Sequence, residues 1–303
     1  ADLSLVRRMK QSCRVGLAAA IAALGVVLAL LAGSTAQAEA IRVTDIAGRE
    51  VVLAQPARRI VLGAWVSLDA LSLIHPDPVG LLAGWAEAGA NAIQPAILRQ
   101  KFPAIASVPV IGKGSFETIS IEAVIAQKPD LVLLSRFDAF RFGSEAAPGL
   151  DQLAAAGIPV AIVDFFLDPL KNTEPSLRIL GKLLGREAQA EAFLTFYRQH
   201  LAAIESKLGT TRPAVFLHAF ATRPECCFSA GPGTIDGFIR LAGGLNIGTE
   251  KLTAPIGQLS QEFVLTRNPD LRAEGAVVVH SPAEALEAAG DAPEIAIIGG
   301  EEI

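Results

Sequence analysis

Side chains that commonly bind metals or form crosslinks are scarce in this sequence. Its 303 residues include three cysteines, four histidines and a single tyrosine. The histidines are scattered, and no two show the spacing of zinc or manganese ligands. A bare metal site built on histidine is therefore not expected, and the chain is predicted to hold no metal or other cofactor. The histidines are His75, His200, His218 and His280.

Cysteine pairs are equally limited. Cys226 and Cys227 are the two cysteines outside the amino-terminal segment, and they are adjacent. Adjacent Cα atoms lie about 3.8 Å apart across a trans peptide. That separation is below the usual disulfide range of about 4.4–6.8 Å, so we expect two free thiols.

An excess of positive charge is also absent. The chain carries 26 Lys and Arg against 31 Asp and Glu, for a net charge of −5. The first 38 residues are themselves basic, so the remainder is more acidic than the whole. This balance argues against nucleic acid or an anionic membrane surface as a partner.

A long apolar run lies near the start of the chain. Four basic residues come first, between Arg7 and Arg14, and the apolar run covers residues 15–31. Ala36-Gln37-Ala38 then gives a small-x-small cleavage pattern, so residues 1–38 have the layout of a secretory signal peptide. The alternative is an uncleaved membrane anchor, because the run is near the lower limit of about 20 residues for a span. Met9 is the expected translation start.

Short apolar runs alternate with helical patterns along the rest of the chain. Residues 41–53 read as a hairpin, residues 78–82, 131–134 and 158–163 as strands, and residues 67–74 as a helix. A further helix should begin at Ser120 and end before Pro129, because the residue before a proline avoids the helical region. The alternation predicts an α/β fold with a mostly parallel sheet and helices on both faces.

Residues 174–208 differ, since apolar side chains recur there at intervals of three and four residues, which is typical of helices. Gly185 should separate a short helix from a long one. The α/β pattern restarts after residue 208. We therefore predict an amino-terminal α/β lobe over 39–172, bridging helices over 173–208 and a carboxy-terminal α/β lobe over 209–303.

One motif occurs twice, once on each side of the bridging helices. Ser120 to Leu131 reads SIEAVIAQKPDL, and Ser260 to Leu271 reads SQEFVLTRNPDL. Both follow S-x-E-x-V-x-x-x-x-P-D-L, in each case at a helix expected to precede a strand. We interpret the copies as equivalent elements of two similar lobes. Chance is the alternative, because Pro-Asp before a strand is common.

Several segments in this order resemble one known family. They are TDIAGREVVL followed by ARRIVLG, SIEAVIAQKPDLVLL, LGKLLGREAQAEAF, and GGLNIG leading into SQEFVL, over about residues 41–270. The chain resembles the periplasmic binding proteins of iron-siderophore, haem and vitamin B12 ABC importers. The resemblance implies a monomeric periplasmic protein without enzyme activity, two α/β lobes bridged by a stiff helix, and a ligand cleft between the lobes.

The resemblance also implies site residues. A glutamate on each lobe docks on the membrane permease in this family, and these match Glu122 and Glu262, although a carboxylate in a first helical turn is also favoured by the helix dipole. Loops at strand ends should hold a large anionic iron chelate through aromatic faces and guanidinium groups. For the tryptophans, core packing is an open alternative. The ligand-binding candidates are Trp65, Trp85, Arg136, Phe137, Arg141, Phe220, Arg223 and Phe228.

These residues do not separate a ferric siderophore from haem or cobalamin. Haem often takes a tyrosine or histidine as axial ligand. The only tyrosine, Tyr197, lies on the expected long helix, which lowers the rank of haem. The sequence therefore favours a ferric siderophore or similar chelate.

The second copy of the motif is followed by an unexpected pattern. The segment from Val264 to Gly300 resembles a central piece of dihydrofolate reductase, with Ser281 as a helix cap, Pro282 at the first helical position and Glu284 after it. We expect residues 271–303 to be atypical of the binding-protein family and the second lobe to be truncated. An NADPH-dependent reductase built on this tail is therefore one rival function. The other is a membrane-tethered α/β domain, which requires that residues 15–31 stay uncleaved.

Overall fold

The computed structural model describes residues 39–87, 95–113, 118–140, 147, 149–219 and 227–275. The predicted signal peptide, residues 1–38, and most of the reductase-like tail, residues 276–303, lie outside this part of the chain. Within the described residues, no helix is long and apolar enough to cross a membrane.

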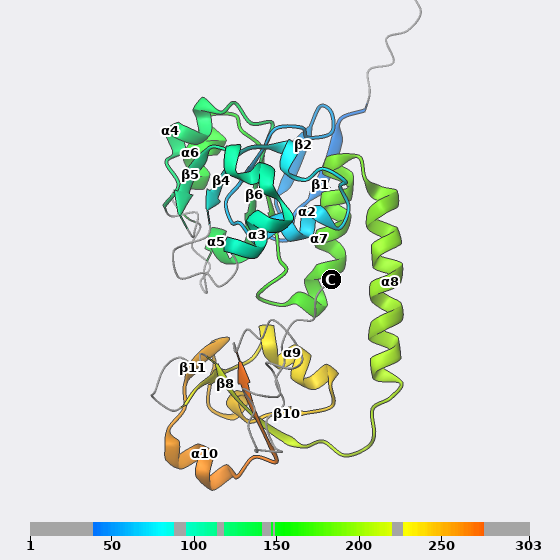
Figure 1. Ribbon diagram of the computed structural model, residues 1–303, viewed down its shortest axis with the longest axis vertical. Coiled ribbons are helices and arrows are strands. Elements are labelled where there is room, and N and C mark those ends of the chain that lie inside the picture. Colours follow the sequence, from blue (N-terminus) through cyan, green and yellow to red (C-terminus); the bar gives the residue numbers. More distant parts are fainter. Residues whose placement is uncertain are drawn as a thin grey trace, which may run out of the picture. The chain divides into compact units, whose positions relative to one another are not determined.

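A five-stranded parallel sheet forms the first lobe (Figure 1). Its strand order is β5-β4-β3-β6-β7, so the chain fills one side of β3 first and then returns to the other side. β3 and β6 pair in register from Ile60 with Leu131 to Leu62 with Leu133. The strands are β3 (Ile60–Leu62), β4 (Leu82–Glu87), β5 (Val110–Lys113), β6 (Leu131–Ser135) and β7 (Val160–Val163).

Helices cover both faces of this sheet, and the alternation of side chains on β6 shows why. Leu131 and Leu133 join a core on one face, whereas Val132 and Leu134 join a second core on the other. A central strand of a parallel sheet is buried on both faces and is therefore continuously apolar. The predicted α/β fold class is confirmed. The helices are α2 (Ser67–Ser72), α3 (Pro95–Lys101), α4 (Ile121–Ala126), α5 (Arg136–Phe140) and α6 (Gly149–Ala155), with 3-10 turns η1 (Val79–Leu81) and η2 (Pro103–Ser107).

The predicted hairpin is present as β1 (Ile41–Thr44) and β2 (Glu50–Leu53), which pair antiparallel. Gly48 has a φ of 79° in the turn, where a glycine avoids the strain of a side chain. The buried Asp45 carboxylate accepts hydrogen bonds from the Arg49 side chain and from the Ile162 amide. The hairpin is therefore joined to strand β7.

The strand expected over residues 78–82 is wrong. Those residues form the turn η1, and β4 begins only at Leu82. Asp77 explains the difference, because its carboxylate oxygen Oδ1 accepts a hydrogen bond from the Gly80 amide at 3.0 Å. A side chain that bonds nearby backbone in this way favours a turn over an extended strand.

Two helices connect the lobes in the chain, α7 (Pro169–Leu184) and α8 (Glu187–Glu205). Gly185 separates them in a left-handed conformation, as predicted. Helix α7 begins earlier than the expected residue 174. Pro169 occupies its first turn, where a missing amide hydrogen costs no hydrogen bond, and Pro175 is accommodated inside the helix.

Ion pairs join these two helices along their exposed sides. Arg178 on α7 lies 2.6 Å from Glu191 on α8 and 3.1 Å from Glu174 on its own helix. Arg198 on α8 contacts Glu191 at 3.3 Å. The hydrogen bond from Arg178 lowers the pKa of Glu191, so the pair stays charged as the solution becomes acidic. The network adds to the apolar contacts that α7 and α8 share in the first core.

A smaller parallel sheet forms the second lobe. Strand β8 (Ala214–Ala219) lies between β10 (Leu245–Asn246) and β12 (Leu271–Gly275). The segment that follows the second motif copy is therefore a strand, paired with β8 from Leu271 with Val215 to Gly275 with Ala219. The other elements are an antiparallel pair, β9 (Phe228–Ala230) with β11 (Ile256–Gln258), the helices α9 (Thr234–Leu241) and α10 (Gln261–Arg267), and the turn η4 (Ile247–Glu250).

The two motif copies have the same local structure. Ser120 and Ser260 each cap a helix by accepting a hydrogen bond from the amide three residues on, at 3.1 Å in both cases. Lys128 and Asn268 each have a positive φ, 47° and 43°, directly before the motif proline. A proline disfavours the right-handed helical region for the residue before it, so each helix ends in the same way.

The motif aspartate joins each copy to a neighbouring strand. The Asp130 carboxylate accepts hydrogen bonds from the Arg58 and Arg59 amides, just before β3. The Asp270 carboxylate accepts one from the Ala214 amide at 2.7 Å, at the start of β8. The shared pattern therefore has a shared structural cause, and chance is the weaker explanation.

The expected free thiol at position 227 is wrong. Cys227 is disulfide-bonded, and its side chain is fully buried. The partner cysteine lies outside the described residues.

Candidate functional site

The strand order of the first lobe locates a candidate binding site. The chain runs outward from β3 through β4 to β5 and then returns to place β6 on the other side of β3. Ligands of open α/β sheets bind outside the carboxyl ends of the strands, at the position where the strand order reverses. That position is between β3 and β6. The residues that follow these strands form what we call the switch-point edge, residues 63–66 and 135–138.

Gly63 allows the loop after β3 to pass close to β6. Its amide donates to the Leu133 carbonyl at 2.9 Å, and a Cβ atom at this position would lie 2.1 Å from a methyl carbon of Leu134. A larger residue at this position would have to displace the buried Leu134 side chain. The loop then presents Trp65, which is half-buried against the first core, and Val66, which is 45% exposed.

Two buried side chains fix the turn after β6. The Ser135 hydroxyl donates to the Asp138 carboxylate at 2.5 Å and accepts from the Asp138 amide at 3.0 Å. This pairing fixes the backbone on either side of Arg136 and Phe137. The Arg136 side chain is exposed, and no hydrogen bond or ion pair joins it to another described residue.

A third loop contributes an aromatic side chain that the sequence did not suggest. The Asp164 carboxylate, fully buried after β7, accepts hydrogen bonds from the amides of Phe166, Leu167 and Asp168. It also accepts one from the Asn172 side chain at 2.7 Å. Four bonds to one carboxylate fix the loop. An aspartate directly after a buried strand was the available signal.

Phe166 is presented by this loop, and it lies against a predicted site residue. Its ring is 43% exposed and lies 5.6 Å from the Phe137 ring in an edge-to-face arrangement. Such aromatic pairs are favourable because the edge of one ring faces the electron-rich face of the other. Phe137 and Phe166 therefore form an aromatic surface next to Arg136.

The structure places the two tryptophans differently. Trp65 borders the switch-point edge, whereas Trp85 on β4 is only 3% exposed and belongs to the first core. Core packing, the open alternative for both residues, is what the structure shows for Trp85. The indole nitrogen of Trp85 has no hydrogen-bond partner among the described residues.

The remaining candidates belong to other parts of the chain. Phe228 is half-buried on β9, in the second lobe, where it pairs with Gln258 of β11. Arg141, Phe220 and Arg223 lie outside the described residues. The structure thus brings together Trp65, Arg136 and Phe137 on one edge of one sheet and leaves the second half of the predicted set untested.

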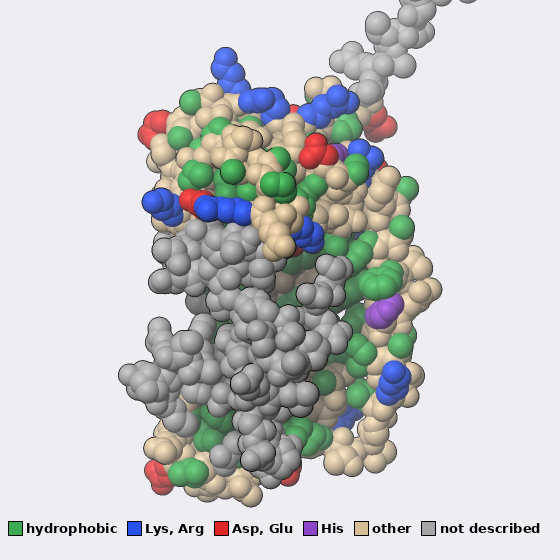
Figure 2. Space-filling model, viewed as in Figure 1, with side chains coloured by type: hydrophobic (Ala, Val, Ile, Leu, Met, Phe, Trp, Pro, Cys, Tyr) green, Lys and Arg blue, Asp and Glu red, His purple; other side chains and the backbone are tan. Residues whose placement is uncertain are grey.

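The described residues offer no alternative metal centre. Among them, no three His, Cys, Asp or Glu side chains converge in a way that could hold a metal ion. On the face drawn in Figure 2, basic side chains lie beside hydrophobic ones over the first lobe.

The two predicted docking glutamates have matching positions. Glu122 and Glu262 are both exposed in the first turn of their helices, two residues after the capping serine. The pKa of Glu122 is lowered, first by a hydrogen bond from its own backbone amide and then by the Ser120 hydroxyl, 3.0 Å away. Its carboxylate therefore keeps its charge in mildly acidic solution.

Comparison with known proteins shows the family of the chain. Residues 72–272 match the family model described as periplasmic binding protein. The chain belongs to the periplasmic binding protein family. Membership implies a periplasmic or extracellular location, and the similar proteins are binding proteins and not enzymes.

Several known proteins are similar to this chain. A vitamin B12-binding protein of Yersinia pestis is 32% identical over 160 residues, which is 52% of each chain. The chain therefore spans about half the length of the curated relatives it matches. The TroA-like periplasmic binding protein FepB of Veillonella parvula has 26% identity and a TM-score of 0.63, over 81% of this chain and 72% of that one. The siderophore-binding protein BauB, solved with acinetobactin and ferric iron, shares the fold at 18% identity and a TM-score of 0.58, over 78% and 76%.

Proposed function

We propose that this member of the periplasmic binding protein family captures a ferric siderophore or a similar iron chelate and delivers it to the permease of an ABC importer. The observation that carries the proposal is the switch-point edge. There, Arg136, which has no hydrogen-bond or ion-pair partner among the described residues, lies next to the aromatic pair of Phe137 and Phe166. A guanidinium group can bind chelate oxygens while aromatic faces contact the organic part of the ligand.

A chelate fits better than a free metal ion for a chemical reason. A protein that binds bare iron must supply several hard or nitrogen ligands itself. No such cluster occurs among the described residues. In a siderophore the iron ligands belong to the small molecule, so the protein needs only to recognise its charge and shape.

Cobalamin is the second candidate, and one observation favours it. The curated relatives with 32% identity are vitamin B12-binding proteins. Haem has less support, because Tyr197 lies on α8 and not on a loop at the switch-point edge. The charge of Arg136 favours an anionic chelate over cobalamin.

Equilibrium dialysis tests the proposal directly. The purified protein is dialysed against ferric catecholate and hydroxamate siderophores, cyanocobalamin, haemin and ferric chloride, and retained absorbance is measured. We expect saturable one-to-one retention of at least one ferric siderophore. Retention of cyanocobalamin alone would assign the second candidate, whereas retention of none of the chelates would refute the proposal.

Docking on the permease belongs to the same proposal. Glu122 and Glu262 are exposed at equivalent positions of the two motif copies. Each provides a carboxylate that a basic residue of a membrane permease can pair with. Because charge across an interface mainly affects orientation and association, these residues are expected to act after ligand capture and not during it.

For the reductase-like tail, we propose no activity. Strand β12 ends at Gly275, and the family model ends at residue 272. The resemblance of residues 276–303 to a reductase stays a prediction, because they lie outside the described residues. Binding of NADPH by the purified chain, followed by fluorescence, is the experiment that would support the reductase alternative.

A further inference from the structure

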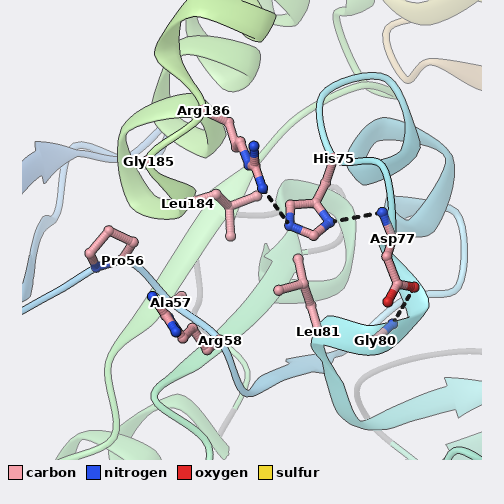
Figure 3. A pocket seen from close by; sticks show the side chains of 10 residues that line it. All are labelled: Pro56, Ala57, Arg58, His75, Asp77, Gly80, Leu81, Leu184, Gly185 and Arg186. Carbon is pink, nitrogen blue, oxygen red and sulfur yellow. Dashed lines mark hydrogen bonds between the residues drawn. The ribbon is translucent and has the colours of Figure 1, made fainter.

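A cavity lies on the first lobe, at the amino ends of strands β3 and β4 and therefore at the opposite end of the sheet from the switch-point edge. Its volume is about 560 Å³. Three segments line it: the approach to β3, the loop between α2 and η1, and the turn between α7 and α8. We call it the amino-edge pocket. Its charged and titratable groups are Arg58, His75, Asp77 and Arg186 (Figure 3).

His75 is held in this pocket by a backbone hydrogen bond. The Asp77 amide donates to ring nitrogen Nδ1 of His75 at 3.2 Å. An amide can only donate, so Nδ1 must carry its lone pair. A neutral imidazole has one proton, and it must then lie on Nε2.

The other ring nitrogen faces a second donor. Nε2 of His75 lies 3.4 Å from a terminal guanidinium nitrogen of Arg186 (Figure 3). A guanidinium group also can only donate. With the proton on Nε2, two donors, Nε2–H and the guanidinium group, face each other. With the proton on Nδ1, Nδ1–H faces the Asp77 amide instead. With both ring nitrogens protonated, each one faces a donor. Every accessible protonation state therefore leaves two donors facing each other.

An acceptor in the pocket would remove this conflict. We propose that the amino-edge pocket binds a small oxyanion, a carboxylate or phosphate group, between Nε2–H of His75 and the guanidinium group of Arg186. Arg58 adds a second positive charge to the lining. Hydrogen bonds from charged donors to an oxyanion are short and strong, and the fork of an arginine matches carboxylate and phosphate geometry.

Asp77 is the one negative group in the lining, and its carboxylate is turned away from the proposed ligand. Oδ1 accepts from the Gly80 amide at 3.0 Å, and Figure 3 shows the carboxylate directed toward Gly80 and not toward Arg186. A Cβ atom on Gly80 would lie 2.2 Å from Oδ2 of Asp77. Gly80 therefore allows Asp77 to fold into this turn, and its charge does not fill the gap between His75 and Arg186.

The site has a structural consequence beyond binding. Arg186 caps helix α8, and its amide bonds the Gly181 carbonyl across the left-handed turn at Gly185. An anion bound to Arg186 would thus fix the turn between α7 and α8 relative to the loop that holds His75. Ligands that bind only the folded state raise its apparent stability.

Imidazole NMR on the intact protein tests the proposal without a mutation. Nitrogen-15 spectra of the four histidines are recorded during titration with sodium phosphate or sodium acetate, each against sodium chloride at equal ionic strength. We expect saturable shifts of the His75 signals, with Nδ1 unprotonated and Nε2 protonated in the bound state. Phosphate and acetate arms distinguish the two ligand chemistries. Shifts no larger than those in chloride would overturn the proposal.

Matched variants assign the site. Arg186→Gln should weaken binding about tenfold or more, because it removes a charged hydrogen-bond donor. Arg42→Gln is the control, since Arg42 is an exposed arginine that pairs with Glu50 on the hairpin and does not line the pocket. Equal affinity of both variants and the wild type would place the anion elsewhere. Neither variant is expected to lose siderophore binding. A result that overturns anion binding in the amino-edge pocket would therefore leave the proposed function untouched.

Discussion

Arg136 is the residue on which the proposed ligand chemistry depends most. It is exposed beside Phe137, and no hydrogen bond or ion pair joins it to another described residue, so replacing it leaves no buried group without a partner. Arg136→Gln should weaken binding of an anionic ferric siderophore roughly 10- to 100-fold, as expected for loss of one charged hydrogen bond. Arg99→Gln is the matched control, because Arg99 is an exposed arginine already paired with Glu87.

Isothermal titration of the retained chelate measures the two affinities, and urea unfolding of the same samples checks that both variants are folded. An Arg136→Gln protein with wild-type affinity would show that the guanidinium group does not contact the ligand.

The residue before each motif proline offers a test of backbone strain. Lys128 and Asn268 both have positive φ values, yet asparagine tolerates this conformation better than lysine. Lys128→Asn should therefore stabilise the first lobe by about 0.5 kcal/mol, and Asn268→Lys should destabilise the second by a similar amount. Urea unfolding gives both values. The same sign for the two changes would contradict this explanation.

At the scale of elements, the motif aspartates hold the start of a neighbouring strand. Asp130→Ala removes the acceptor for the Arg58 and Arg59 amides and should lower the free energy of unfolding by about 1–3 kcal/mol. Asp130→Asn keeps one acceptor oxygen and should cost less. Chemical denaturation measures the difference. If both variants unfold at the wild-type midpoint, these hydrogen bonds do not contribute to stability.

Much of the element order could be predicted from the sequence. Strand β6 and helix α4 were predictable because a continuous apolar run and a capping serine are local signals. The start of α7 was missed, because Pro175 reads as a helix start and only the packed structure shows the helix beginning at Pro169. The turn at Asp77 was missed for a similar reason, since its carboxylate bonds a backbone amide that sequence periodicity does not reveal.

The candidate site was predictable only in part. Trp65, Arg136 and Phe137 follow two strands that proved to be neighbours, which strand order decides and sequence does not. Trp85 lies one strand away and is buried, although it looked equivalent in the sequence. Phe166 was missed because its position depends on the four hydrogen bonds that Asp164 accepts.

For the whole molecule, transport requires docking as well as ligand capture. Glu122→Arg and Glu262→Arg should leave chelate affinity unchanged and reduce binding to the cognate permease, because each reversal places like charges together at the contact. Docking on permease in nanodiscs measures this, with Glu250→Arg as a control on the second lobe. Docking through Glu122 should persist as pH falls through the usual glutamate range, because its pKa is lowered.

The opposite result would contradict the docking role of Glu122 and Glu262. Loss of chelate binding with intact docking would show that the two glutamates belong to the ligand site and that the assignment from the repeated motif is wrong.

The central claim is that a ferric chelate binds at the switch-point edge, and the two tryptophans allow one measurement to test it. Trp65 borders that edge, and Trp85 is buried in the first core. Fluorescence is followed while the retained ferric siderophore is added to the wild type, Trp65→Phe and Trp85→Phe. We predict strong saturable quenching in the wild type and in Trp85→Phe, and little quenching in Trp65→Phe. Quenching that is lost in Trp85→Phe and kept in Trp65→Phe, or absent from all three proteins, would contradict the account.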